Sequence, residues 1–237
     1  MLEYNTNIPL FPLNVVLFPG MMLPLHIFEE RYKIMIRECL ADGSPFGVVL
    51  AKQTEQQIEE GETVSKEFYR IGTTARITAV EHLKDGRMNL ITVGQDRFVV
   101  KEFHPSLNNF FIGQVDPFQL HEGQDEKRVL QLTEALRVIV ERYIGHLADA
   151  SGEDLSGATI PTEPKALAFL AGTAIQGPTW AHQSDKQQLL SSTSLSSLIG
   201  KTIRVLDKED KILSYMLKAY QAHKQVDRLP FVDYSLN

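Results

Sequence analysis

The sequence predicts an α+β protein in which a β-rich first half that holds one helix is followed by a helical second half. Between residues 69 and 119, short apolar and β-branched runs alternate with turn residues, as antiparallel strands do. From Lys127 onward, apolar residues recur every three or four positions, which is typical of amphipathic helices. This change of period predicts two lobes, residues 1–122 and residues 123–237.

The densest apolar stretch runs from Ile8 to Ile36 and is divided by prolines. Its three apolar runs are Ile8–Phe11, Val15–Phe18 and Met21–Ile27. Pro19-Gly20 predicts a type II turn, because proline fixes φ at the first central position and glycine tolerates a positive φ at the second. We therefore expect strand, turn and strand, followed by a helix over Glu29–Leu40, whose intervening residues are charged.

The rest of the first half predicts an antiparallel meander, arranged as a small barrel or a sandwich. Its expected strands are Ile71–Val80, Met88–Val93, Arg97–Phe103 and Phe110–Phe118, and Phe46–Leu50 is a separate strand expected before them. Lys84–Arg87 contains the Asp-Gly pair of a hairpin turn, and Gly94–Asp96 predicts a second turn. Gln53–Glu67 is glutamate-rich and lacks a period, so we expect a polar surface loop there.

The second half predicts four helical segments after the change of period. They are Lys127–Leu147, Pro161–Gln176, Asp185–Leu190 and Ser194–Tyr220, with a polar linker over residues 148–158. The serines and threonine of residues 191–194 are typical of a helix N-cap. Together these segments predict a C-terminal helical bundle.

Composition argues against several classes of protein. The net charge of −6 and the absence of a dense Lys/Arg cluster predict no nucleic-acid partner. No apolar run approaches the roughly 18 residues of a membrane span, and the N-terminus lacks the features of a signal peptide. Cys39 is the only cysteine, which excludes an intrachain disulfide and predicts a small core residue. We expect a protein of the reducing cytoplasm without a membrane partner.

No motif for catalysis, a metal or a cofactor is present, so we expect none of the three. Gly200-Lys201-Thr202 resembles the end of a P-loop, but Leu195 stands where the first glycine is needed, and we expect solvent-facing helix residues instead. The seven histidines lack zinc-site spacing, and His26 is interpreted as a core or turn residue. A hydrolase with a dispersed triad leaves no such trace and stays open.

Five residues are candidates for a binding surface: Met21, Met22, Phe110, Phe111 and Trp180. Thioethers adapt to varied partners, which is the reason for the two methionines. Simple core packing is the competing interpretation. It is favoured for one of the two phenylalanines, because consecutive strand residues face opposite sides.

The order of these motifs resembles one known family. The opening PLFPLNVVLFPGMMLPLHIFEERY, at residues 9–32, is similar to the start of the amino-terminal domain of Lon ATP-dependent proteases. Further similar segments follow in order: Ile71–Thr73, Asp85–Arg87, Gly94–Phe98, Ala168–Ala171 and Lys186–Leu190. The resemblance covers almost the whole chain. It implies a β-rich, barrel-like lobe followed by a helical bundle.

The resemblance also implies a function. Lon proteases continue into ATPase and protease domains, whereas this sequence ends at Asn237 without a Walker motif. We therefore expect a stand-alone, non-catalytic module that binds unfolded or client polypeptides, for example by strand addition at a free sheet edge. An adaptor or scaffold for a partner ATPase, protease or chaperone is the alternative, and a hydrolase with a dispersed active site is the third.

Overall fold

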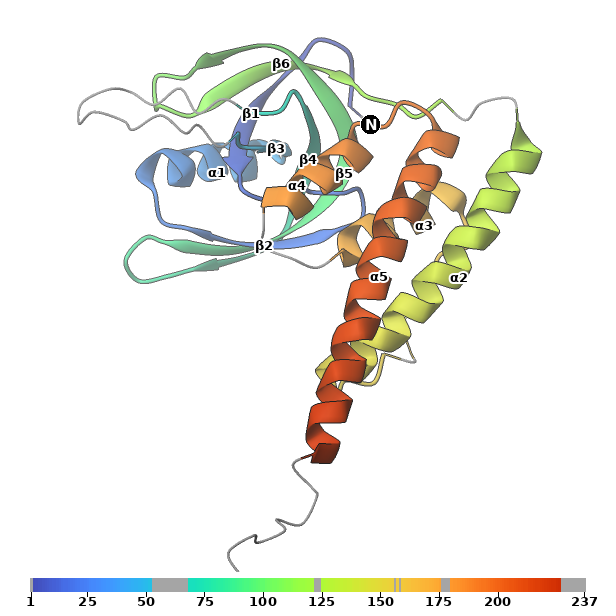
Figure 1. Cartoon of the computed structure of the whole chain (residues 1–237). Helices are drawn as coiled ribbons and strands as arrows, with labels where there is room; N and C mark the ends of the chain where they lie inside the picture. Colours follow the sequence, from blue (N-terminus) through green and yellow to red (C-terminus); the bar gives the residue numbers. More distant parts are fainter. Residues whose placement is uncertain are drawn as a thin grey trace, which may run out of the picture.

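The computed structural model confirms an α+β fold with a barrel-like lobe followed by a helical bundle (Figure 1). It describes residues 2–52, 68–121, 125–155, 157, 159–175 and 180–226, without the side chains of 180, 181 and 221–226. The strands are β1 (Thr6–Leu13), β2 (Met22–Ile27), β3 (Phe46–Leu50), β4 (Ile71–His82), β5 (Met88–Pro105) and β6 (Phe111–Pro117). The helices are α1 (Glu30–Asp42), α2 (Glu126–Ser151), α3 (Pro164–Ala174), α4 (Trp180–Leu190) and α5 (Leu195–Val226).

Five of the six strands close into a ring. The sheet order is β2-β5-β4-β3-β1-β6, and β5 also pairs with β6. β1 lies parallel to β3 and antiparallel to β6, whereas the other pairs are antiparallel. β2 is attached outside the ring, to β5. The expected meander is therefore correct for β4, β5 and β6, while β1 completes the barrel from the other end of the chain.

The predicted turn at Gly94–Asp96 is wrong, because β5 runs through it as one strand. The register between β4 and β5 shifts at this point, which marks a bulge. Gly94 donates its N–H to the carbonyl of Met21 (2.9 Å) and accepts from the N–H of Gly20 (2.8 Å). A Cβ on Gly94 would lie 2.2 Å from the carbonyl oxygen of Phe18. The glycine therefore permits a close backbone approach.

The strand expected at Val15–Phe18 is also wrong, although the turn after it is correct. Gly20 has φ +80°, and Met21 donates its N–H to the Phe18 carbonyl (3.0 Å), as a type II turn requires. β1 continues through Pro12 to Leu13. The residues that follow run between the two lobes without strand pairing. Two of their backbone groups, at Val16 and Leu17, instead form hydrogen bonds with side chains of other elements.

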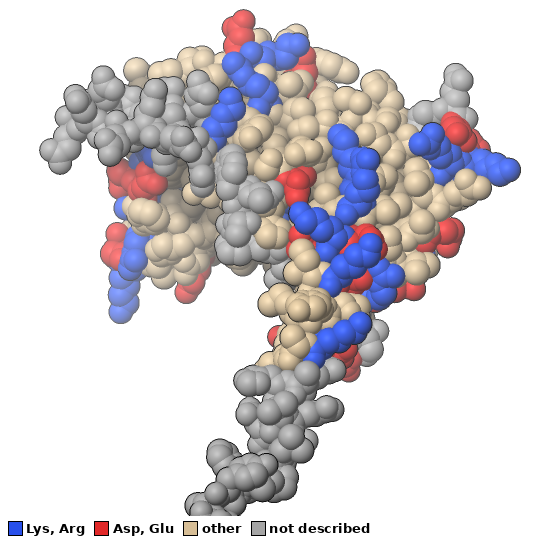
Figure 2. Space-filling model, in the orientation of Figure 1, with Lys and Arg blue, Asp and Glu red and all other residues tan. Residues whose placement is uncertain are grey.

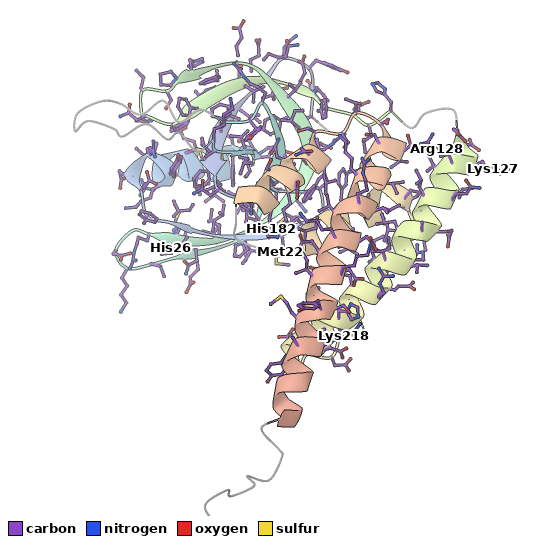
Figure 3. All side chains as sticks on the ribbon, in the orientation of Figure 1. Met22, His26, Lys127, Arg128, His182 and Lys218 are labelled. Atoms are coloured by element: carbon purple, nitrogen blue, oxygen red, sulfur yellow. The ribbon has the colours of Figure 1, made fainter. Side chains whose placement is uncertain are left out.

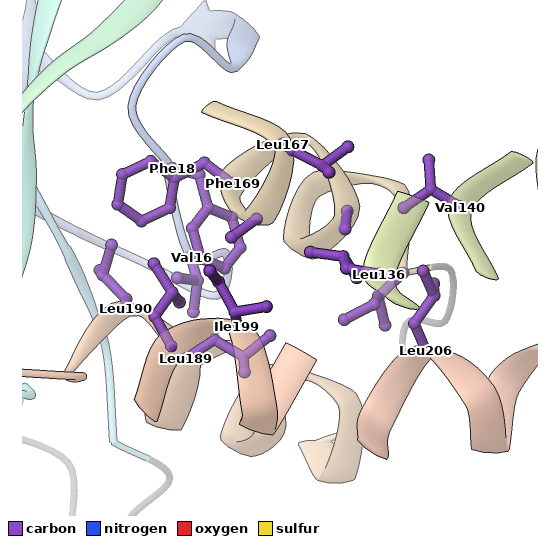
Figure 4. Close-up of a cluster of buried hydrophobic side chains, with 14 of the residues drawn as sticks. Val16, Phe18, Leu136, Val140, Leu167, Phe169, Leu189, Leu190, Ile199 and Leu206 are labelled. Carbon is purple, nitrogen blue, oxygen red and sulfur yellow. The ribbon is translucent and has the colours of Figure 1, made fainter. Parts of the chain in front are cut away.

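The segment Val16–Phe18 joins the two lobes, because its side chains alternate between two cores. Val16 and Phe18 belong to the helical core (Figure 4). Leu17 belongs to the core of the β lobe. Val16 donates its N–H to Oε1 of Gln183 on α4 (3.2 Å). The Leu17 carbonyl accepts from the hydroxyl of Thr73 (2.6 Å). Extended backbone suits this position, since consecutive side chains then point to opposite sides.

A second contact between the lobes is Arg97, a β5 residue with only 6% of its surface exposed. Its Nη1 donates to the carbonyls of Leu190 and Ser192 (2.9 Å for the latter), at the C-terminal end of α4. The guanidinium also lies 4.8 Å from the ring of Phe118 and 5.7 Å from that of Phe169. The last carbonyls of a helix lack intrahelical donors and carry partial negative charge, so the guanidinium satisfies them.

The helical lobe is built on α2 and α5, which lie side by side and project beyond the β lobe (Figure 1). Its core is shared by all four helices and includes Leu136, Leu167, Leu189, Ile199 and Leu206 (Figure 4). The division of the chain into lobes at residue 122 stays a prediction.

Other expectations on the helices have mixed outcomes. Ser194 accepts from the N–H of Ser197 (3.3 Å), so the predicted N-cap is confirmed. Thr202 was expected to face solvent, which is wrong: it is buried, and its hydroxyl donates to the Leu198 carbonyl (2.9 Å). The loop expected at Gln53–Glu67 lies outside the described residues. Of the helices that the structure describes, none has the length and apolarity of a membrane span.

Candidate binding surface

β2 has one free edge along its whole length, because within the described residues it pairs with β5 alone. The bond from Gly94 to the Met21 carbonyl starts the ladder between β2 and β5. Alternation along an antiparallel pair then turns the backbone groups of Met22, Pro24 and His26 toward the free edge. Proline has no N–H, so the middle donor of this edge is missing. The edge is thereby protected against addition of a further strand.

The side chains of β2 form an exposed row at every second residue. Leu23 and Ile27 are buried, whereas Met22, Pro24 and His26 are exposed. Phe28 continues the period beyond the strand and leaves 60% of its surface exposed, close to the 63% of Met22. We define these four exposed residues, Met22, Pro24, His26 and Phe28, as the β2 row. It spans about 20 Å at strand rise, and three of its four members are apolar.

The far end of the β2 row is polar. Nδ1 of His26 lies 2.8 Å from Oδ1 of Asn89, and the Asn89 amide donates to Glu81 (2.8 Å). The His26 ring stacks on Phe28 with ring centroids 6.1 Å apart. The expected core or turn position of His26 is therefore wrong, because the alternation of β2 places its ring outward on a strand. The ring nitrogen nevertheless has a hydrogen-bond partner, Asn89. The polar groups give this end of the row a hydrophilic border.

The near end of the row lies where the two lobes meet. We call this region, which contains Val16–Phe18 and Arg97, the joint. Met21 is partly buried and packs against both the helical core and the β-lobe core. Figure 3 shows Met22 on the side of the molecule that carries His182 of α4, with His26 at the opposite end of β2. Of the two adjacent methionines, Met22 presents its thioether to solvent, and Met21 fills the joint.

The other predicted residues lie away from the β2 row. Phe110 is 3% exposed and packs in the β-lobe core, so its ring offers no surface. Phe111 is partly buried against Phe68 and Phe103, with centroids 5.8 and 5.5 Å away. Trp180 begins α4, and its side chain lies outside the described part. The structure thus leaves Met22 as the predicted residue in the row. The alternation in MLPLHIF was the signal for the other three.

A groove lies between the C-terminal halves of α2 and α5. This groove encloses about 540 Å³. Apolar side chains from both helices line it, among them Leu147, Leu213 and Met216. The acidic residues Glu153 and Glu209 also line it, and Glu209 lies 3.4 Å from the ring of His182.

The described residues offer little to covalent chemistry. Cys39 lies in the β-lobe core, and burial raises the pKa of its thiol to about 11. Reaction of a cysteine requires the thiolate, so this thiol is inert near neutral pH. In the ranges described, no three His, Cys, Asp or Glu side chains are grouped so that they could hold a metal ion.

Comparison with known proteins assigns the family. Residues 7–208 match the family described as the ATP-dependent protease La (LON) substrate-binding domain. The chain belongs to this family. The similarity to the Lon amino-terminal domain that the sequence predicts is thereby confirmed.

Individual relatives agree with the family. A Lon protease of Brevibacillus choshinensis is 25% identical over 94% of this chain and 28% of its own length. One of Anaeromyxobacter dehalogenans is 26% identical over 92% of this chain and 25% of its own. This Lon-family chain therefore spans about a quarter of these relatives.

Solved structures show the same fold. The N-terminal domain of a Mycobacterium avium complex Lon protease has a TM-score of 0.55 at 18% identity, over 87% of this chain and 98% of its own. A Lon N-terminal domain protein from Xanthomonas campestris has a TM-score of 0.50 at 24% identity, over 84% and 98%.

Proposed function

We propose that this Lon-family domain is a non-catalytic polypeptide-binding module, and that the β2 row contacts apolar segments of unfolded clients. The exposed apolar row on the solvent-facing side of β2 is the observation that carries this proposal. Folded proteins bury most of their large apolar side chains, whereas unfolded chains expose them. A surface that recognises exposed apolar side chains therefore distinguishes unfolded from folded clients.

The proposed contact is made by side chains and not by strand addition. Pro24 removes the central donor of the edge, so a bound strand would lose one ladder bond and leave its own carbonyl unpaired. Met22 is flexible and polarizable, which suits varied side chains. Phe28, stacked on His26, offers a flat aromatic face. We expect little sequence specificity beyond the presence of large apolar residues.

The expected affinity of one row is low. Full burial of a methionine or phenylalanine side chain contributes roughly 1.5–3 kcal/mol, and association has an entropic cost of several kcal/mol. Two such anchors contribute at most about 6 kcal/mol before that cost, so we expect a dissociation constant of about 1 mM or weaker for a single row. A client with several apolar segments would bind more tightly through repeated attachment.

The proposed module has no turnover of its own. The family is a substrate-binding domain, and its relatives are whole Lon proteases. An adaptor that docks on a partner ATPase or protease is the second role supported by this relationship. Incubation with ester, phosphate and peptide substrates is expected to give no product above a protein-free control. Turnover that copurifies with the chain would contradict the non-catalytic role.

The direct test compares one client in two states. A fluorescent client, reduced and carboxymethylated so that it stays unfolded, is titrated against its native form by anisotropy. We expect binding of the unfolded form and none of the native form. The double variant Met22→Ser with Phe28→Ser should weaken binding roughly a hundredfold, since each lost anchor is worth about 1.5 kcal/mol.

The matched control removes two exposed leucines elsewhere. Leu107, in the loop before β6, and Leu130, on α2, leave 103% and 62% of their surfaces exposed. The double variant Leu107→Ser with Leu130→Ser should retain the affinity of the parent chain. Equal affinity for native and unfolded client, or an equal loss in both double variants, would overturn the proposal.

A further inference from the structure

α5 carries a row of basic residues on an otherwise acidic protein. Its members are Lys201, Arg204, Lys208, Lys211 and Lys218. Positions 201, 204, 208, 211, 215 and 218 follow one another at steps of three and four, so they form one row on the helix, with Tyr215 as its aromatic member. Figure 2 shows blue side chains following α5 down the visible face. The row spans about 25 Å at helical rise, and we call it the α5 basic row.

Most of its charges are uncompensated within the described residues. Lys211 pairs with Asp207 (2.6 Å), which also accepts from Arg142 (3.2 Å). No ion pair among the described residues involves Lys201, Arg204, Lys208 or Lys218. From Lys201 to Lys211, neighbouring members of the row are three or four residues apart, which is about 5–6 Å between Cβ atoms. This spacing is shorter than the Debye length of about 8 Å at physiological salt, so their fields add. Like charges at these spacings destabilise an isolated helix slightly, and an anionic partner would relieve that repulsion.

An apolar row runs beside the basic one. Ile212 and Met216 are separated by four residues, and they leave 47% and 61% of their surfaces exposed. Both line the groove of about 540 Å³ between α2 and α5. Tyr215, in the basic row, is 75% exposed. The acidic Glu209 and Glu153 of the groove oppose an anionic ligand there, so a ligand's acidic side chains must face the lysines and its apolar ones the groove.

We propose that this face of α5 binds an acidic amphipathic polypeptide segment, with Asp or Glu on the basic row and apolar side chains over Ile212 and Met216. Two parallel rows of different chemistry require a ligand with the same division. The proposal rests on polypeptide binding as the function of the domain. It adds a second surface, and the ligand of this surface is acidic. The net charge of −6 would by itself favour basic clients.

A polypeptide fits this surface better than a nucleic acid does. The cations form a single row, and the row next to it is apolar. Nucleic-acid surfaces instead combine several phosphate contacts with broad positive potential. The repulsion from a chain of net charge −6 also acts on a polyanion beyond the row.

The test uses three 18-residue helix-forming peptides with identical apolar positions and Glu, Gln or Lys at the positions that face the basic row. Fluorescence anisotropy with the full chain is expected to give an affinity for the Glu peptide at least tenfold above that for the Gln peptide. Affinity for the Lys peptide should be lower still. Raising the salt concentration from 50 to 200 mM should reduce the difference, because exposed charges are screened.

Two double variants separate the row from the overall charge. Lys208→Glu with Lys218→Glu should lower affinity for the Glu peptide roughly tenfold, since each reversed exposed charge replaces an attraction by a repulsion. Lys127→Glu with Arg128→Glu makes the same change of charge at the start of α2 (Figure 3) and should change affinity less than about twofold. Thermal unfolding of both variants shows whether they remain folded.

Each outcome decides one question. An equal loss in both double variants, or equal affinity for the Glu and Gln peptides, overturns the α5 proposal. So does a preference for a 20-base-pair DNA duplex over the Glu peptide. If the chain binds the unfolded client but not the Glu peptide, polypeptide binding by the β2 row survives and the α5 proposal fails. If it binds neither, the proposed function itself fails.

Discussion

Phe18 and Met22 are four residues apart in one apolar stretch, yet Phe18 is fully buried while Met22 leaves 63% of its surface exposed. Phe18 belongs to the segment between the two lobes, where both faces of an extended chain meet a core. Met22 begins the β2 row, where one face meets the core and the other meets solvent. Apolar density alone therefore does not separate residues that stabilise the fold from residues that are available to a client.

The largest effect on stability is expected at Phe18. Phe18→Ala removes a ring packed against Phe169 and Gly172 and should lower the free energy of unfolding by roughly 3–5 kcal/mol. Urea denaturation measures the loss. Alkylation of Cys39 then reports on the β lobe, because the pKa of this thiol is raised by burial in that core. Slow alkylation in the variant would show that only the joint opens, and fast alkylation that both lobes unfold together.

Arg97 tests the polar half of the joint. Burial lowers the pKa of its guanidinium to about 10, which keeps the group charged at neutral pH. Arg97→Met keeps much of the apolar volume near Phe118 and Phe169 but leaves the carbonyls of Leu190 and Ser192 without this donor. We expect a loss of roughly 2–3 kcal/mol by urea denaturation, because buried unsatisfied carbonyls are costly. A stability equal to that of the parent would show that water satisfies these carbonyls.

Gly172 tests how tightly the joint is packed. A Cβ at this position would lie 2.9 Å from Cζ of Phe18, whose ring is fully buried. Gly172→Ala should therefore cost roughly 1–2 kcal/mol through overpacking. Gly145→Ala in α2 is the control: its Cβ meets nothing within 4 Å, so alanine should stabilise by up to about 1 kcal/mol. Stabilisation by both alanines would mean that the Phe18 ring moves freely.

The smallest effect on stability is expected in the β2 row. Met22→Ser with Phe28→Ser changes exposed side chains and should shift the free energy of unfolding by no more than about 0.5 kcal/mol. Thermal and urea unfolding measure this shift, while client binding falls as proposed above. A loss comparable to that of Phe18→Ala would mean that these side chains support the fold, which would remove the contrast between the two segments.

Local patterns determined most of the secondary structure. Gly86 of the Asp-Gly hairpin and Gly43 at the end of α1 both have a positive φ. These features depend on the conformational preferences of a few adjacent residues, which the sequence contains in full. The motif order was also sufficient to predict the Lon family, because several short matches in sequence order are specific together.

Tertiary contacts decided the rest. The sequence around Gly94 is typical of a turn, but Gly94 lies within β5. Its backbone forms hydrogen bonds with the backbone of Gly20 and Met21. Val15–Phe18 has the composition of a strand, but it pairs with no strand. Its side chains instead pack alternately into the helical core and the β-lobe core. The ring required β1 to pair with β3 and β6, which no local period encodes.

The same division applies to the candidate surfaces. An α+β Lon-family domain and the period of two through MLPLHIF can both be predicted from the sequence. Which half of that alternation is exposed depends on tertiary contacts, because the partner strand β5 covers one edge of β2 and the core covers one face. Tertiary contacts likewise decide that α2 covers one face of α5 and leaves the basic row outside. Burial is a property of neighbours distant in the chain, and a single sequence does not state which neighbours meet.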